Sequence, residues 1–502
     1  MFAERLRTVF STNEHRVAVD IASLSIELRY GELAAAADEW SHALGSIGRP
    51  LVLLLDKGPR YYELMAMMFL HRVSFCPLDP LNPDTLVAAV CSALGNPVVL
   101  CDASDRIRSL RSLGLDVIDV REPREYEVSS GNCEPGRYFI STSGSTGVPK
   151  LVEVRHDALQ RFVDWGIEFL GVTATSRFSQ FASIGFDLSI AEISIAWSSG
   201  AALVPTRSLA EIARLDRMVT TNRITHWLSV PSVVPYLTRD PSLDFSALEV
   251  LIFCGEPLLR THCEAVWSCA PGARIVNTYG PTEGTVFCTY YEVTDRDIAN
   301  PALPSMPIGT AISGWNLLFL REPTTPTEPT DESEDFFRLV ILGEDIAEGY
   351  FGRHHDDFSE VSVGSRMVRS FNTGDYFTAV GQSMCFSHRA DQMVKINGNR
   401  VDLGQIANAC SAAGVQHPLV LVIDHELVVC HDGGMASVGT DPISPVAAAE
   451  IERVTASLRT MLPPALLPKR HVVISSFPRT ASGKIDRTRI AQLLDDYEAI
   501  SI

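Results

Sequence analysis

Apolar and polar residues follow patterns along the first 130 positions that are typical of alternating helices and buried strands. RYGELAAAADEWSHALGSIG (29–48) has the spacing of an amphipathic helix that ends at glycine, and YYELMAMMFLHRV (61–73) predicts a second helix. RPLVLLLDKG (49–58) and SFCPLDP (74–80) are apolar runs closed by turn residues, which is typical of buried strands. The same rhythm continues through ARIVNTYGPTEGTVF (273–287). This alternation predicts α/β layers around parallel sheets.

The pattern changes near residue 390. HPLVLVIDHELVVCHDGG (417–434) predicts a β-hairpin, PVAAAEIERVTASLRTML (445–462) an amphipathic helix, and KRHVVISSF (469–477) a strand. We therefore expect an α/β protein with a large domain of layered subdomains over 1–388 and a small, mobile α+β domain over 389–502. The polar stretch REPTTPTEPTDESED (321–335) predicts a surface loop.

Composition limits the classes of function. The chain has 502 residues, enough for two or more domains, and its formal net charge is −19, which disfavours binding to nucleic acid or to anionic membranes. No apolar run approaches the ~20 residues of a membrane helix, and the first twenty residues lack the apolar core of a secretion signal. The 11 cysteines include no CxxC pair, which is typical of reduced thiols. We therefore expect a cytoplasmic protein.

The segment STSGSTGVPK (141–150) is the first candidate for chemistry. Its small residues let backbone N–H groups approach an anion, its hydroxyls add donors, and its lysine adds charge. It follows the strand-like RYFI (137–140), so it leaves the end of a strand, which is a common position for phosphate binding. Its spacing is not that of a Walker loop, which disfavours a kinase or GTPase. Taken alone, such a segment is more often a plain turn.

Four further segments decide the interpretation: FASIGFDLSIAE (181–192), FCGEPL (253–258) with NTYGPTEGT (277–285), FNTGDYF (371–377) with SHRADQMVKINGNR (387–400), and RTASGKIDR (479–487). Together with STSGSTGVPK they stand in the order and spacing of the adenylate-forming superfamily, which nearly the whole chain resembles. Within it, the sequence is most similar to the amino-acid adenylation domains of nonribosomal peptide synthetases and to stand-alone D-alanine–carrier protein ligases.

The resemblance implies a two-step reaction that needs ATP and Mg²⁺. An amino acid and ATP give an aminoacyl-adenylate and pyrophosphate, and the aminoacyl group then passes to the phosphopantetheine thiol of a carrier protein. The enzyme must hold the carboxylate and the α-phosphate in line and neutralise the charge that develops. The 15 residues after Arg487 leave no room for a carrier domain, so we expect a separate carrier protein.

The family's nucleotide-binding positions carry over by motif. The phosphate loop would supply Thr142, Ser143, Gly144, Ser145, Thr146, Gly147 and Lys150. Adenine, ribose and the α-phosphate would be contacted by Gly255, Glu256, Pro257, Asn277, Thr278, Tyr279, Gly280, Thr282, Asp375, Arg389 and Lys395. Tyr279 is expected to stack on adenine, and Asp375 to accept the ribose hydroxyls.

Three positions carry separate roles in the resemblance. Glu283 is expected to bind Mg²⁺, since a hard cation on ATP oxygens prefers carboxylate oxygen. Lys484 resembles the catalytic lysine of the small domain, and it would bridge the substrate carboxylate and the α-phosphate as a point charge. Asp391 lies where the family places the hinge between the adenylating and thiolating states. Without the motifs, Lys484 would be interpreted as an ordinary surface lysine.

Asp187 is the most informative position for the substrate. In amino-acid-activating relatives an aspartate here pairs with the α-ammonium group by a charge-assisted hydrogen bond. The alternative is an aspartate that caps the following helix. The rest of the pocket would be uncharged, which favours an aliphatic or small aromatic side chain: Leu188, Ala191, Val233, Ile252, Cys254, Thr278, Val286 and Phe287.

The amino acid itself stays open. Ala191 and Val233 are smaller, and Phe287 larger, than expected around D-alanine, so neither the side chain nor its chirality is assigned, nor whether the amino acid is α or β. Leu151, Asn372 and His388 also replace residues usual in the family.

Two rival hypotheses are an acyl- or aryl-CoA ligase, which has no need of Asp187, and a non-catalytic homologue that binds a partner or nucleotide. Five basic residues of the small domain could receive an acidic carrier surface: Lys469, Arg470, Arg479, Arg487 and Arg489. The oligomeric state is not predicted.

Overall fold

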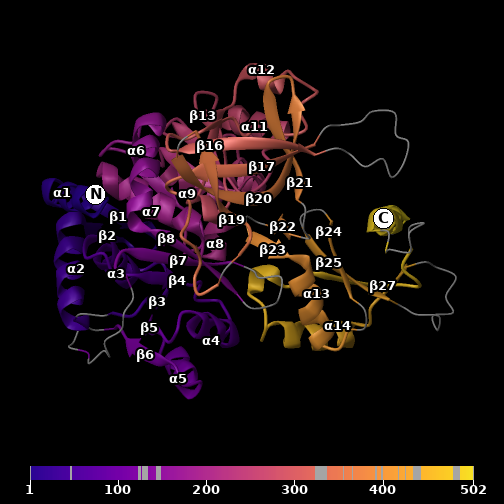
Figure 1. The fold of residues 1–502 in the computed structure, drawn as a ribbon, viewed down its shortest axis with the longest axis horizontal. Helices are drawn as coiled ribbons and strands as arrows, with labels where there is room; N and C mark the ends of the chain where they lie inside the picture. Colours follow the sequence, from indigo (N-terminus) through magenta and orange to yellow (C-terminus); the bar gives the residue numbers. More distant parts are fainter. Residues whose placement is uncertain are drawn as a thin grey trace. The chain divides into compact units, whose positions relative to one another are not determined.

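The protein, seen in a computed structural model, is described over residues 2–45, 48–121, 126, 134–142, 149–322, 336–353, 355–364, 366–389, 393–396, 399–415, 418–423, 426–432, 443–478, 485 and 487–500. The chain divides into two compact units. One is built mostly from residues up to Asp391 and the other mostly from those after it (Figure 1). The expected α/β class is confirmed, and the hinge at Asp391 stays a prediction because Asp391 lies outside the described residues.

The largest sheet of the first unit has the strand order β15-β14-β13-β12-β11-β9-β10-β1-β2. Its strands are β1 (Val17–Ile21), β2 (Ile26–Arg29), β9 (Arg177–Gln180), β10 (Ala202–Pro205), β11 (His226–Ser229), β12 (Val250–Phe253), β13 (Arg274–Tyr279), β14 (Thr289–Glu292) and β15 (Thr310–Ala311). The strands from β1 to β13 in this order pair in parallel. Every residue of β10, β11 and β12 is buried, as expected for parallel strands covered on both faces.

A second sheet has the order β18-β8-β7-β4-β3-β5-β6. Its strands are β3 (Leu51–Leu54), β4 (Phe75–Pro77), β5 (Val98–Cys101), β6 (Asp116–Asp119), β7 (Arg137–Thr142), β8 (Lys150–Arg155) and β18 (Gly349–Tyr350). The strands expected within 49–58 and 74–80 are confirmed as β3 and β4. The phosphate-loop candidate connects the antiparallel strands β7 and β8, so its two ends are held side by side.

A third sheet joins β16 (Trp315–Glu322), β17 (Phe336–Gly343), β20 (Arg366–Val380) and β19 (Phe358–Val363), and β21 (Ser383–Arg389) also pairs with β20. The pairing of β20 with β21 sets Asp375 directly opposite Arg389. Residues 321–322 end β16, while the rest of the polar stretch 321–335 lies outside the described residues. This sheet therefore brings two of the expected nucleotide residues together.

Helices pack on these sheets (Figure 1): α1 (Phe2–Thr12), α2 (Tyr30–Leu44), α3 (Pro59–Leu70), α4 (Asp84–Ala93), α5 (Ser104–Ser112), α6 (Leu159–Leu170), α7 (Asp187–Ser199), α8 (Leu209–Ile212), α9 (Leu215–Thr221), α10 (Val234–Leu237), α11 (Arg260–Cys269) and α12 (Asp295–Ile298). The two helices expected in the first hundred residues are confirmed as α2 and α3. α7 is buried on almost every side, and a Cβ at Gly166 of α6 would lie only 2.8 Å from Ile195 Cδ1, so glycine allows the close approach of α6 and α7.

The second unit contains two described sheets. β22 (Met393–Ile396) pairs with β23 (Asn399–Asp402), and the other sheet has the order β24-β25-β27-β26. Its strands are β24 (Leu419–Ile423), β25 (Glu426–Asp432), β26 (Ile443–Pro445) and β27 (Arg470–Ile474), with helices α13 (Leu403–Ala412), α14 (Ala448–Leu458) and α15 (Arg487–Ile500). The predicted hairpin, helix and strand are confirmed as β24–β25, α14 and β27.

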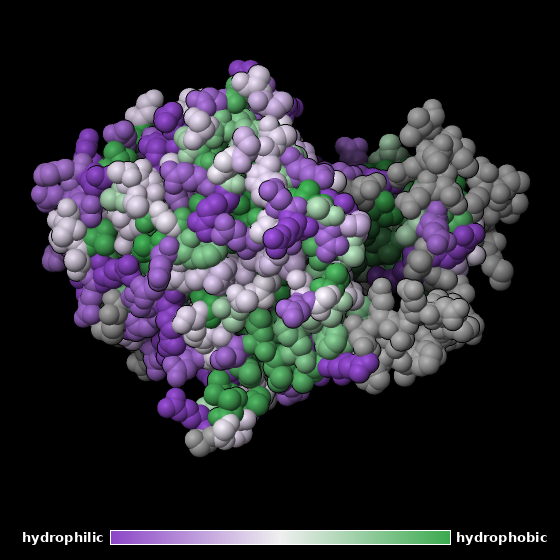
Figure 2. Space-filling view, turned by 90° about the horizontal axis from the view of Figure 1, so that it is seen from above, coloured by the Kyte–Doolittle hydropathy of each residue, from purple (hydrophilic) through white to green (hydrophobic). Residues whose placement is uncertain are grey.

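The polarity of the surface and the state of the cysteines are what the composition leads us to expect. Hydrophilic residues cover much of the face shown in Figure 2, beside a smaller hydrophobic area. All ten cysteines in the described part of the chain are free thiols, and nine of them are buried. Over the same part, no helix combines the length and apolar character needed to cross a membrane.

Candidate active site

The predicted substrate and adenine segments follow parallel strands of the largest sheet. The loop that leads to Asp187 begins after β9, Cys254 to Pro257 follow β12, and Gly280 to Phe287 follow β13. Residues at the ends of these strands are in register, since Ser229 of β11 pairs with Phe253 and Phe253 with Asn277. The carboxyl ends of parallel strands are the usual ligand edge of such a sheet. The topology therefore gathers these segments at one edge.

Asp375 is a buried carboxylate held by two donors. The hydroxyl of Tyr279 donates to Asp375 Oδ2 at 2.5 Å, and Arg389 Nη1 donates to Asp375 Oδ1 at 2.6 Å. The Asp375 side chain is 2% exposed and the Arg389 side chain 7%. Burial, and then the Asp375 charge, raise the pKa of Tyr279 well above its usual value, so its phenol stays a donor. Each carboxylate oxygen has a second acceptor site, which leaves capacity for hydroxyls of a ligand.

The backbone around this carboxylate is also fixed. Asp375 N donates to Thr373 Oγ1 at 3.1 Å, and Thr373 Oγ1 donates to Leu339 O at 2.8 Å. Arg389 Nη2 donates to Thr373 O at 3.0 Å, and the Phe377 ring packs edge-on against Tyr279 with centroids 5.3 Å apart. Sequence reasoning missed Thr373 and Phe377, although both lie in the FNTGDYF motif. These contacts therefore fix how the Asp375 carboxylate, the Tyr279 ring and the Arg389 guanidinium lie relative to one another.

Asn277 and Thr278 are oriented by main-chain carbonyls. Asn277 Nδ2 donates to Met306 O at 3.1 Å and to Pro307 O at 2.8 Å, while Thr278 Oγ1 donates to Phe253 O at 3.0 Å. Both side chains are buried. Because both amide N–H groups of Asn277 have protein acceptors, its amide oxygen is the atom left to meet a ligand donor such as an adenine amine.

The turn after Gly280 is conformationally constrained. A Cβ at Gly280 would lie 2.4 Å from Phe287 Cα, so only glycine allows this close approach. Thr285 and Val286 have φ of 63° and 72°, in the left-handed region that β-branched residues rarely adopt. The Thr285 hydroxyl donates to Asp345 O, which helps to hold this conformation. Such strain is often found at functional sites, and here it shapes the turn η4 (Thr282–Gly284) that presents Thr282 and Glu283.

Glu283 lies next to a tyrosine that sequence reasoning missed. Its carboxylate is fully buried, and Tyr350 donates its hydroxyl to Glu283 Oε1 at 2.6 Å. The face of the Tyr350 ring lies 4.8 Å from Lys150 Nζ, so one ring contacts both the candidate metal ligand and the phosphate-loop lysine. No cluster of three metal-ligating side chains occurs in the described part of the chain. Proteins often hold Mg²⁺ by one or two carboxylates together with substrate phosphates, and this is the role predicted for Glu283.

Asp187 is the first residue of α7, and Phe186 occupies the N-cap position. Asp187 therefore lies in the first turn of α7, where a negative charge also suits the helix N-terminus, and both predicted roles of Asp187 stay predictions. The Asp187 side chain is 9% exposed, and its charge adds to burial in raising the pKa of the nearby Tyr138 well above its usual value. Among the predicted pocket residues, Leu188 is half-buried. The others are buried: Ala191, Val233, Ile252, Cys254, Thr278, Val286 and Phe287. The Phe287 ring packs edge-on against Phe162 and Trp165.

Two buried, electrostatically coupled side chains, Lys57 and Glu192, support the loop that leads to Asp187. Lys57 Nζ donates to Gln180 O at 2.8 Å, to Phe181 O at 3.1 Å and to Thr206 O at 3.1 Å. Glu192 Oε1 accepts from Phe181 N at 2.8 Å. Burial lowers the pKa of Lys57 and raises that of Glu192, and their mutual attraction opposes both shifts. Sequence reasoning missed both residues, although an acid inside the apolar run SIAEISIAW is a usable signal of a buried partner.

Removing the Lys57 ammonium is expected to destabilise the fold. Lys57→Met leaves three main-chain carbonyls without their donor and removes the positive charge that offsets the burial of Glu192, and should lower the free energy of unfolding by about 3–5 kcal/mol. Adding Glu192→Gln removes the ionisable carboxyl group but keeps an acceptor for Phe181 N. The free energy of unfolding of the double variant should therefore be at least about 1 kcal/mol higher than that of Lys57→Met. Urea unfolding of the two single variants and the double variant measures the coupling. Strictly additive losses would contradict an electrostatic coupling of Lys57 and Glu192.

The sequence matches the family described as AMP-binding enzyme over residues 7–351. The chain belongs to the AMP-binding enzyme family. A curated relative, the D-alanine–D-alanyl carrier protein ligase of Staphylococcus aureus (strain MRSA252), is 26% identical over 501 residues, 98% of this chain and 99% of its own. The chain is thereby an AMP-forming ligase that uses ATP to make an adenylate. The superfamily resemblance inferred from the motifs is confirmed.

Solved structures show that this AMP-binding enzyme has the adenylation-domain fold. The Vibrio cholerae adenylation domain AlmE, in complex with glycyl-adenosine-5′-phosphate, superimposes with a TM-score of 0.78 at 20% identity, covering 99% of this chain and 98% of its own. PA1221, a nonribosomal peptide synthetase protein that contains adenylation and PCP domains, gives a TM-score of 0.79 at 23% identity, covering 97% of this chain and 83% of its own.

Several positions expected from the family lie outside the described residues of this AMP-binding enzyme: Ser143, Gly144, Ser145, Thr146, Gly147, Asp391 and Lys484. Lys395 lies in β22, and its side chain is not described. Thr142 and Lys150 pair with each other at the two ends of the phosphate loop. Among the adenine-side residues, Glu256 Oε2 accepts from Ser232 N at 3.0 Å, beside η3 (Pro231–Val233). The roles of these residues stay predictions.

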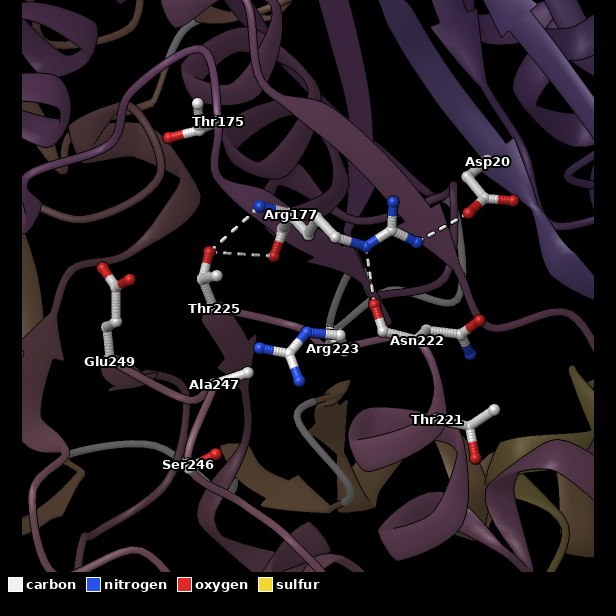
Figure 3. A pocket seen from close by; sticks show the side chains of 10 residues that line it. All are labelled: Asp20, Thr175, Arg177, Thr221, Asn222, Arg223, Thr225, Ser246, Ala247 and Glu249. Carbon is white, nitrogen blue, oxygen red and sulfur yellow. Dashed lines mark hydrogen bonds and ion pairs between the residues drawn. The ribbon is translucent and has the colours of Figure 1, made fainter.

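A polar cavity of about 580 Å³ lies at the other end of the same strands (Figure 3). Its lining includes Arg177 at the start of β9, Thr225 just before β11 and Glu249 just before β12. Arg177 Nη2 donates to Asp20 Oδ2 at 2.6 Å, and its Nε donates to Asn222 O at 2.6 Å. The cavity is therefore distinct from the ligand edge of the AMP-binding enzyme.

Proposed function

We propose that this AMP-forming ligase activates an amino acid and transfers the aminoacyl group to the phosphopantetheine thiol of a separate carrier protein. The observation that carries the proposal is Asp187, a nearly buried carboxylate among otherwise uncharged pocket residues. A cation that reaches a nearly buried carboxylate forms a strong charge-assisted hydrogen bond. The α-ammonium group of an amino acid would form such a bond with Asp187, whereas a fatty or aryl acid carries no such cation.

In the first half-reaction, a carboxylate oxygen of the amino acid attacks the α-phosphorus of ATP. The bond from that phosphorus to the bridging oxygen of the β-phosphate breaks, and pyrophosphate leaves with the electron pair. Asp375 would accept the ribose hydroxyls, Tyr279 would contact the adenine, and Thr282 the α-phosphate. The phosphate loop and Lys150 would hold the outgoing pyrophosphate. Glu283 would hold Mg²⁺, which would supply charge neutralisation at the phosphate oxygens.

Lys484 is proposed to neutralise the charge that builds up between the carboxylate and the α-phosphate. In the second half-reaction the thiolate attacks the acyl carbon, a thioester forms, and AMP leaves with the electron pair. We propose that rotation at Asp391 removes Lys484 from the site between the two steps. Asp391→Pro should then affect the two half-reactions unequally.

The carrier-protein partner is supported by the curated relatives named D-alanine–D-alanyl carrier protein ligase and by the adenylation–PCP protein PA1221. On the second unit, Lys469 forms an ion pair with Glu426 at 2.8 Å, while Arg487 and Arg489 lie in α15. Arg479 lies outside the described residues. Charge reversal at Arg487 and Arg489 should raise the KM for the carrier protein and leave adenylation unchanged. Unchanged loading of the carrier would contradict this docking surface.

The pocket favours an aliphatic or small aromatic amino acid, because none of its predicted side chains is charged. D-Alanine and glycine occur in the names of similar proteins, and both remain candidates beside larger amino acids. ATP–pyrophosphate exchange across D- and L-α-amino acids, β-amino acids, fatty acids and aryl acids tests the proposal. Exchange with an amino acid whose side chain is uncharged supports it. Exchange only with fatty or aryl acids, or with no carboxylate at all, would contradict it.

A further inference from the structure

Lys150, the first residue of β8, is held by side chains from a loop two hundred positions away in the sequence. Its Nζ lies 3.2 Å from His355 Nε2 and 4.8 Å from the centre of the Tyr350 ring. An ammonium group has donors and no acceptor, so His355 Nε2 must be the acceptor in this contact. This contact requires the tautomer in which the ring proton lies on Nδ1.

The second nitrogen of His355 faces a carboxylate. His355 Nδ1 lies 2.9 Å from Asp357 Oδ2, within ion-pair distance, while the contact lacks the angle of a hydrogen bond. Asp357 therefore acts mainly through its charge, which favours a proton on Nδ1. This is the same tautomer that the contact with Lys150 requires. Asp357, His355 and Lys150 thus form a consistent chain of contacts.

The backbone brings this loop to the start of β8. β18 pairs antiparallel with β8, and Phe351 N donates to Leu151 O at 2.8 Å just beyond that pairing. The Phe351 ring packs edge-on against Phe139 of β7 with centroids 5.1 Å apart. Asn372 N then donates to Asp357 O at 2.8 Å and anchors the far end of the loop. His355 is held at both ends of a short connection.

The exposure of His355 and Asp357 argues against a role for these side chains in packing the hydrophobic core. The side chains of His355 and Asp357 are 35% and 38% exposed. A half-exposed imidazole that contacts the ammonium beside the phosphate loop is placed where it can influence a ligand. A neutral acceptor also has a chemical advantage there, because a carboxylate in the same place would cancel the charge of Lys150 and compete with phosphate.

We propose that His355, oriented by Asp357, is a positioning residue that holds Lys150 ready for the β- and γ-phosphates of ATP. The inference rests on the proposed function, in which Lys150 meets the pyrophosphate part of the nucleotide. A free lysine side chain loses much conformational freedom when it binds an anion. His355 and the Tyr350 ring restrict that freedom before ATP arrives, so less is lost on binding.

Steady-state exchange kinetics with three substitutions test this role. His355→Ala should raise the KM for ATP about tenfold, while kcat and the KM for the amino acid stay within about twofold. His355→Gln keeps a neutral acceptor and should restore most of the ATP affinity. His355→Glu should raise the KM for ATP at least as much as alanine does. His15→Ala, at a histidine whose side chain is 92% exposed, is the matched control.

An unchanged KM for ATP in His355→Ala, or an equal rise in the KM for both substrates, would overturn the inference. If His355→Ala does not fold, the difference between His355→Gln and His355→Glu decides the question in the same way. Calorimetric titration of the enzyme with pyrophosphate alone separates this inference from the proposed function. A weaker affinity in His355→Ala supports the positioning role even if no amino acid is activated, and an equal affinity contradicts it.

Discussion

Asp187→Asn is expected to lower kcat/KM for the amino acid by about 10²-fold or more, with the KM for ATP unchanged within about twofold. The reason is the loss of a nearly buried negative charge that is proposed to face the substrate ammonium, while the amide keeps the size and shape of the side chain. Pyrophosphate exchange at varied amino acid and varied ATP separates the two effects.

The matched control for Asp187 is Asp216→Asn on α9. Asp216 is also buried, at 2% exposure, its Oδ1 accepts from Arg217 N at 2.8 Å, and it is not among the predicted pocket residues. This control should leave the KM for the amino acid unchanged. The assignment of Asp187 fails if Asp187→Asn leaves kcat/KM for the amino acid intact, or raises the KM for ATP as much as the KM for the amino acid.

Lys484→Ala is expected to slow adenylate formation by about 10²–10³-fold, because a charge placed on the developing transition state is lost. Transfer from supplied aminoacyl-adenylate to the carrier protein should stay within about fivefold, since Lys484 is proposed to leave the site before that step. Rapid-quench measurements of the two half-reactions give both numbers. Arg459→Ala, at the C-cap of α14, removes a cation from the same unit as a control. Equal losses in both half-reactions would contradict the proposed role.

Much of the fold could be predicted because its elements are long or strongly patterned. The continuous apolar run around β3 and the helical spacing of α2 and α3 each admit one interpretation. The motifs also indicated Tyr279, Asp375 and Arg389 as nucleotide residues. Their mutual hydrogen bonds could not be predicted, because Tyr279 and Asp375 are 96 positions apart and meet only when β13 and β20 are placed.

The residues that sequence reasoning missed lie where local pattern carries little information. Tyr350 belongs to a two-residue strand, and His355 lies in a short loop whose position depends on pairing with β8. Lys57 follows a buried strand in what looks like an exposed turn, yet three backbone carbonyls from distant segments surround its ammonium. Each role is set by tertiary contacts, which periodicity and turn chemistry do not encode.

We propose above all that the enzyme recognises the ammonium group of its substrate through Asp187. The most direct test compares the best amino acid found by pyrophosphate exchange with the same acid lacking only its amino group. We predict that kcat/KM for the amino acid exceeds that of the des-amino acid by about 10²-fold or more in the wild-type enzyme, and that Asp187→Asn removes most of this difference. Equal or faster exchange with the des-amino acid in the wild-type enzyme would contradict the account.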